Sequence, residues 1–224
     1  MKVLIFDSGA LINLSMNGLL YVLQDLKKNF DGRFIITEQV RYETVDRPIG
    51  IQRFEFGAIQ VKNLIDSGVI EMSSTLKIDN NELKKRTKNL MDKANHLMQV
   101  RGSWVHLVEE AEMSCLALSS ILNDNKIDNI IAIDERTTRS ICENPENLER
   151  MMSEKIHQNV HLIEEDYTEF LKFKFIRSSE LLFVAYKKGI IKLSGANVLE
   201  ALLYATKYHG SSISFEEINN LKKM

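Results

Sequence analysis

The sequence predicts an α/β protein built on a doubly wound parallel sheet. Three short apolar runs carry this prediction: Val3–Phe6, Phe34–Ile36 and Ile130–Ile133. None of them alternates with polar residues, which is typical of strands buried on both faces, as in a parallel sheet. Segments with apolar residues at helical spacing alternate with these runs, and this order favours helices packed on the faces of the sheet.

Before residue 77, capping residues and apolar spacing define the expected helices. Asp7 or Ser8 can cap a helix after the first strand, and Thr37 can cap one after the second. The expected helical segments are 10–14, 17–26, 38–43 and 51–66, and a further short strand is expected at 69–70.

Between residues 77 and 163 two helical patterns of different character occur. The segment 77–100 is polar and rich in Lys and Asn with a thin apolar stripe, so we expect an exposed helical insertion there. In contrast, a stripe at i, i+4, i+7 and i+11 predicts a core-packed helix over 105–122; its members are Ala111, Cys115, Leu118 and Leu122. The other expected elements are helices over 136–142 and 146–157 and a strand over 160–163.

From residue 164 the pattern changes to helices alone. They are expected over 179–188, 196–207 and 215–222. Ser214 caps the last one, with Glu217 at the third helical position, as in a capping box. We therefore expect an α/β domain over 1–163 and a helical extension over 164–224 packed on it.

Composition limits the classes of function. The chain has 224 residues, with 29 Lys and Arg against 31 Asp and Glu, so it is not a strongly basic protein that holds nucleic acid by bulk charge. Cys115 and Cys142 lie in no metal-spaced pattern, which indicates buried thiols in a reducing compartment. No apolar stretch approaches about 20 residues, so we expect no membrane partner and a cytoplasmic location.

Two carboxylates lie at the ends of expected strands. Asp7 and Asp134 directly follow two of the apolar runs. In open α/β sheets the carboxyl ends of strands near the topological switch point form the ligand crevice, so the two side chains can lie side by side there. Oxygen ligands of this kind favour Mg²⁺ or Mn²⁺. The alternative is that each Asp only caps a helix.

Four segments together resemble the motifs of PIN-domain nucleases. Ile5–Ile12, a strand followed by Asp7, Ser8 and a helix, looks like the opening motif of the family. The segments that resemble the second, third and fourth motifs are 36–43, 109–118 and 131–139. They occur in the family's order and cover about residues 1–163, as in longer archaeal and prokaryotic PIN proteins with a helical extension. The resemblance implies a Rossmann-like three-layer domain with a central parallel sheet.

Carried over by position, the resemblance implies an acidic catalytic cluster. Its members are Asp7, Glu43, Glu110 and Asp134, of which Asp7, Glu110 and Asp134 would bind the metal. Glu112 is the alternative to Glu110, because these two side chains lie about 200° apart on a helix and one alone can point into the pocket. The family often shows Gly-Glu-Ala-Glu here, whereas this chain has Glu109 in place of the glycine.

Three further residues are expected to contact substrate. Ser8 can bond a carboxylate or the water shell of the metal. Arg136 and Arg139 begin the helix after Asp134, at the mouth of the expected pocket, and arginine pairs with phosphate through two hydrogen bonds.

The implied function is a Mg²⁺- or Mn²⁺-dependent endoribonuclease, with RNA as its partner. A homodimer and an inhibitory or scaffolding protein partner stay open. One alternative is a PIN-fold module that binds RNA or protein with little or no catalysis. Another is a phosphatase of the haloacid dehalogenase type, but that chemistry needs a second Asp where this chain has Gly9.

Overall fold

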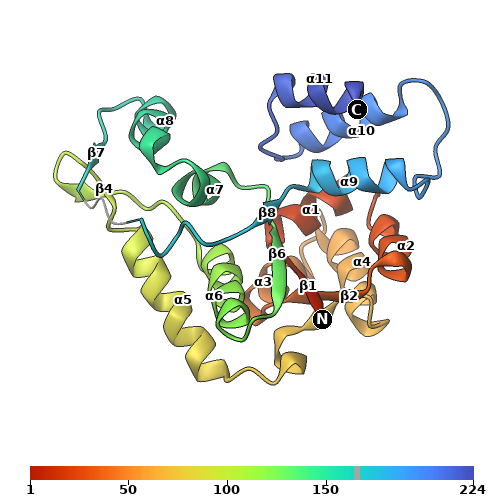
Figure 1. Cartoon of the computed structure of the whole chain (residues 1–224), viewed down its shortest axis with the longest axis horizontal. Coiled ribbons are helices and arrows are strands. Elements are labelled where there is room, and N and C mark those ends of the chain that lie inside the picture. The colour runs from red at the N-terminus through yellow and green to blue at the C-terminus, as the bar shows by residue number, and fades with distance from the viewer. Residues whose placement is uncertain (164–166) are drawn as a thin grey trace.

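A parallel β-sheet forms the centre of the protein (Figure 1). The structure is a computed structural model that describes residues 1–163 and 167–224, and in this part of the chain the sheet has five strands. Across the sheet they are β3 (Glu71–Met72), β2 (Gly32–Ile36), β1 (Lys2–Phe6), β6 (Asp128–Ala132) and β8 (Phe175–Ile176). In the register, Lys2 of β1 faces Gly32 on one side and Asp128 on the other.

Helices cover both faces of the sheet and form the outer layers. One face carries α5 (Asn80–Ala94) and α6 (Glu110–Asp124), and the other carries α1 (Ser8–Met16), α2 (Tyr21–Asn29), α4 (Glu55–Asp66) and α9 (Ser178–Lys187) (Figure 1). The remaining helices are α3 (Glu38–Arg41), α7 (Arg136–Glu143), α8 (Leu148–Ile156), α10 (Val198–Tyr208) and α11 (Phe215–Lys223). The predicted α/β fold with three layers and added C-terminal helices is confirmed.

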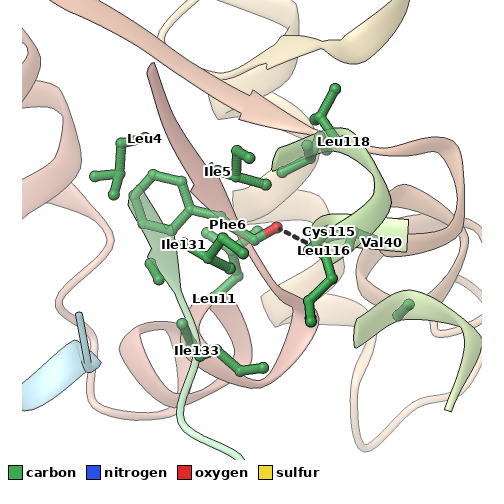
Figure 2. Packing of buried hydrophobic residues seen from close by; sticks show 14 of the residues in the cluster. Leu4, Ile5, Phe6, Leu11, Val40, Cys115, Leu116, Leu118, Ile131 and Ile133 are labelled. Atoms are coloured by element: carbon green, nitrogen blue, oxygen red, sulfur yellow. Dashed lines mark hydrogen bonds between the residues drawn. The ribbon is translucent and has the colours of Figure 1, made fainter. Parts of the chain in front are cut away.

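The apolar residues of β1 and β2 are buried on both faces, as their sequences predict, whereas Ile130 of β6 is 37% exposed. Ile5 and Phe6 are fully buried, and the Phe6 ring packs edge-on against Phe34 with 5.4 Å between ring centroids. In Figure 2, α6 brings Cys115 against β1, where its Sγ lies 3.6 Å from the Phe6 carbonyl oxygen. Every residue from Met113 to Leu122 is buried, because α6 lies between the sheet and α5. Cys142 is a second buried free thiol, as expected.

A small antiparallel sheet replaces the end of one expected helix and precedes the next. It consists of β5 (Ser103–Trp104), β4 (Met98–Val100) and β7 (His161–Leu162). The helix predicted over 77–100 therefore ends at Ala94, and the one predicted over 105–122 begins at Glu110. Arg101 and Gly102 both have positive φ, 50° and 81°, which gives the two-residue turn that joins β4 to β5 as a hairpin. The predicted strand at 160–163 pairs with β4, not with the central sheet.

The expectation that only helices follow residue 164 is wrong, because one strand, β8, occurs there. Residues 164–166 lie outside the described residues, and β8 then adds to the edge of the central sheet, with Ile131 facing Phe175. The expected strand at 69–70 is likewise displaced to β3. In the described ranges no helix combines the length and the apolar composition needed to cross a membrane.

Beyond β8, one buried arginine joins two of the C-terminal helices. Arg177 donates to Glu180 at the start of α9 (2.9 Å) and to Glu217 of α11 (2.6 Å). A small apolar cluster fixes α11 against α10; it contains Leu199, Leu203, Ile213 and Ile218. The helices therefore pack as a unit beside the end of β6 where Asp134 lies.

Candidate functional site

Asp7 and Asp134 lie together where the direction of strand order reverses. From β1 the chain passes to β2 and β3 on one side of the sheet, and later to β6 and β8 on the other. Asp7 follows β1 directly, and its backbone N–H donates to the carbonyl oxygen of Ala132, the last residue of β6, at 2.9 Å. Asp134 follows two residues after that. Both carboxylates therefore stand at the carboxyl edge of neighbouring parallel strands, which is the usual ligand position of such sheets.

Asp7 is buried and incompletely bonded. It caps α1, with Oδ2 accepting a hydrogen bond from the Gly9 N–H at 3.1 Å, and only 2% of the residue is exposed. Oδ1 is also buried, and the described residues offer it no hydrogen-bond partner. Burial raises the pKa of Asp7 to about 7, and the charges of Glu43 and Asp134 act in the same direction. The helix-cap role is therefore real but leaves one carboxylate oxygen unused.

Asp134 is held by three donors. Its Oδ1 accepts from the Ser178 N–H at 2.9 Å, and its Oδ2 accepts from the Ser178 hydroxyl at 2.6 Å and from the Asn13 side-chain amide at 3.0 Å. The same amide group of Asn13 also donates to the Thr206 carbonyl oxygen at 2.9 Å. Burial raises the pKa of Asp134, and the bonds from Ser178 and Asn13 oppose that rise. Asp134 thus joins the sheet to α1, α9 and α10.

Glu43 and Glu110 form the outer part of the acidic group. Glu43 is half-buried in a π-helical turn, Tyr42–Asp46. Burial raises its pKa, the Ser8 hydroxyl opposes the rise by hydrogen bonding, and the charges of Glu109 and Glu110 add to it. Glu110 itself is exposed at the first position of α6. The structure therefore places Glu110 in the electrostatic neighbourhood of Glu43.

Glu112 is the acid of α6 that is electrostatically coupled to Asp7. Burial raises the pKa of Glu112 to about 8, and the next cause is the charge of Asp7. Its Oε2 accepts from the Glu109 N–H and from the Thr138 hydroxyl of α7, both at 3.0 Å. Glu112 is half-buried, whereas Glu110 is exposed. Of the two candidates for the third carboxylate, Glu112 has the stronger link to the inner pair.

The expected substrate residues border the site in different ways. Ser8 is buried next to Glu43. Arg136 is exposed at the first position of α7, while Arg139 donates three hydrogen bonds to Glu143, at 2.7, 3.0 and 3.1 Å. Both arginines line a groove of about 760 Å³ that also reaches Asp134.

Two residues that hold Asp134 were missed from the sequence. Asn13 interrupts the apolar run of α1 and is almost fully buried, so a polar residue on an apolar helix face was the available signal. Ser178 gives no such signal, because a serine before a helix is expected as an ordinary cap.

The donor set fits a divalent cation by charge and chemistry. All candidate ligands are carboxylate oxygens, which suit Mg²⁺ or Mn²⁺, and Oδ1 of Asp7 is buried without a hydrogen-bond partner. In the described ranges no group of three or more His, Cys, Asp or Glu side chains is arranged to hold an ion. Mg²⁺ usually keeps several waters and takes one or two carboxylates directly, so such an arrangement is not required for this ion.

Comparison of the chain with protein-family models, curated proteins and solved structures found no match.

Proposed function

We propose that the protein is a metal-dependent ribonuclease that hydrolyses phosphodiester bonds at this acidic site. The observation that supports the proposal most directly is the buried, unpartnered Oδ1 of Asp7, surrounded by carboxyl groups that raise one another's pKa. The arrangement stands at the switch point of a doubly wound sheet, where ligands of such folds bind.

A bound divalent cation would stabilise the ionised carboxylates of this site. A buried carboxylate without a partner is unfavourable, and nearby carboxylates add repulsion unless protons or a cation neutralise them. Asp7 would hold the ion through its free oxygen, together with Glu112. Asp134, whose oxygens already accept hydrogen bonds from Ser178 and Asn13, would bind the ion through its water shell.

When bound, the metal supplies an activated water and stabilises negative charge on the phosphoryl group. The residues of this chain position the reactants. Ser178 and Asn13 hold Asp134 in one orientation. Glu43, fixed by the Ser8 hydroxyl, accepts a hydrogen bond from the attacking water, and Arg136 contacts a phosphate of the RNA.

The test is cleavage of labelled single-stranded and hairpin RNA with Mn²⁺, Mg²⁺ or EDTA. We expect wild-type protein to cut in a metal-dependent way and Asp7→Asn to lose at least about a hundredfold in rate, because catalysis is lost with the central ligand. Asp31→Asn removes an exposed carboxylate and is the matched control. Equal cleavage by Asp7→Asn would place the activity elsewhere.

Two other results would favour the alternative functions. Tight RNA binding without turnover in either metal would indicate a binding module. A phosphate trapped covalently on Asp7 would indicate a phosphatase, although Gly9 occupies the position where that mechanism needs an acid.

A further inference from the structure

An apolar cavity lies at the edge of the central sheet opposite the acidic site. Its volume is about 210 Å³, and it is lined by residues of α2, of α9 and of the strands between them. Lys2, the first residue of β1, lines the cavity, whereas Asp7 follows the other end of this strand. The cavity is therefore separate from the acidic site.

The floor of the cavity is a row of apolar side chains from three neighbouring strands. In the register of the sheet, Leu4 of β1 is aligned with Phe34 of β2 and with Ile130 of β6, and all three line the cavity. Leu4 lies on the side of β1 away from α6 (Figure 2). Ile130 is 37% exposed although β6 is an interior strand of the sheet. This exposure shows that α2 and α9 leave part of the sheet face open.

The walls of the cavity are apolar as well. On one side Leu26 and Phe30 line it, and the Phe30 ring is tilted against the Phe34 ring with 5.2 Å between centroids. On the other side α9 contributes Leu181 and Val184, of which Val184 is 37% exposed. An apolar cavity of about 150 Å³ is large enough for benzene. The cavity of this protein therefore has room for one aromatic ring with a short substituent.

Two lysines give the rim of the cavity a positive charge. Lys2 and Lys188 line it, both are exposed, and neither forms an ion pair with another described residue. The acid in the lining is Asp128, and Nζ of Lys174 lies 3.3 Å from its Oδ1. Lys174 does not line the cavity, so it matches the charge of Asp128 from outside. Two positive charges therefore remain for a ligand.

We propose that this cavity binds a small aromatic carboxylic acid, with its ring on Leu4 and Ile130 and its carboxylate paired with Lys2 and Lys188. Burial of the ring supplies most of the affinity. The lysines select the anion over a neutral molecule of the same shape. The inference does not depend on the proposed function, because none of the acids assigned to the acidic site lines this cavity.

The test is an NMR titration of the full-length protein, labelled with ¹³C at its methyl groups, with phenylacetate at pH 7. EDTA is present, so that no metal at the acidic site can bind the carboxylate. We expect the methyl signals of Leu4, Ile130 and Val184 to shift with one common dissociation constant of about 1 mM. Phenylacetamide has the same shape without the charge, and it should bind about tenfold more weakly.

Three variants separate the roles of charge and space. Lys188→Met should weaken phenylacetate binding about fivefold and leave phenylacetamide binding unchanged, because the lysine acts through its charge. Val184→Phe fills the cavity from an exposed position of α9 and should abolish the binding of both compounds. Lys84→Met removes an exposed lysine of α5, on the other face of the sheet, and is the matched control that should bind as wild type does.

The results separate this site from binding elsewhere on the protein. The absence of methyl shifts at about 10 mM phenylacetate would overturn the inference, as would equal affinities for the acid and the amide. Shifts that persist in Val184→Phe would place the ligand elsewhere and would also overturn it. A loss in Lys188→Met that Lys84→Met does not share would support the assigned site.

Discussion

Replacing Asp7 with asparagine should stabilise the metal-free protein, and the gain should increase with pH. Burial raises the pKa of Asp7 from 3.8 to about 7, so the folded protein keeps a proton that the unfolded chain releases. The contribution of the protonated Asp7 carboxyl to the free energy of unfolding is fully present below pH 3.8 and is lost as pH rises through about 7. Between pH 5 and pH 8 the loss amounts to about 3 kcal/mol. Asparagine carries no charge and can still accept the Gly9 N–H bond at the helix cap.

Urea unfolding in EDTA, followed by far-ultraviolet circular dichroism at pH 5 and pH 8, measures this effect. The difference in unfolding free energy between Asp7→Asn and wild type should widen by about 3 kcal/mol between the two pH values. Asp31→Asn, at an exposed position, should show no such widening. A difference that stays constant with pH would refute the reasoning, because it would mean that the Asp7 carboxylate is solvated or neutralised in the folded protein.

Three further predictions concern the metal and the C-terminal helices. Glu112→Gln should weaken Mn²⁺ binding about tenfold, and more than Glu110→Gln does, because Glu112 is the acid coupled to Asp7; calorimetric affinities that fall equally would contradict this. Mn²⁺ should raise the melting temperature more at pH 8 than at pH 6, because protons compete with the ion at Asp7, whose pKa is about 7; equal increases would exclude that competition. Arg177→Met should lower the unfolding free energy by about 3 kcal/mol at pH 7. The ion pair lowers the pKa of Glu217 to about 2, so this loss of unfolding free energy should shrink as pH falls from 4.5 toward 2. Urea unfolding measures the loss at each pH, and a loss that stays constant would exclude the charge pair as its cause.

The sequence predicts the elements whose pattern is local and long enough. The run Val3–Phe6 is a strand buried on both faces, and the run at 130–133 gives its first three residues to β6, where Ile130 is 37% exposed. The rule for parallel sheets then brings Asp7 and Asp134 to one edge. In contrast, β8 has two residues between Lys174 and Arg177, and its strand conformation depends on pairing with β6. No local pattern of that length can specify a strand.

The hairpin between β4 and β5 was missed for a different reason. Its turn places Arg101, a residue without special preference for positive φ, in the left-handed region beside Gly102. The strands on either side of the turn have three and two residues, so their apolar side chains, such as Met98 and Trp104, are too few to give a strand pattern.

The inner site could be predicted only in part. The choice between Glu110 and Glu112 depends on where α7 lies, since Thr138 of that helix holds Glu112. Ser178 is 44 residues from Asp134 in the chain, and its bonds to that carboxylate arise from the packing of α9 against the sheet. Long-range contacts of this kind leave no trace in local spacing.

The bonds to Asp134 also set an order of events during synthesis. A ribosome makes Asp134 before Ser178 and Thr206, and nascent domains begin to fold from their N-terminal part. We therefore expect the early strands to pair while the carboxylate still lacks the donors that orient it. The site would be completed only after α9 and α10 have emerged, so that unfinished chains would lack the proposed nuclease activity.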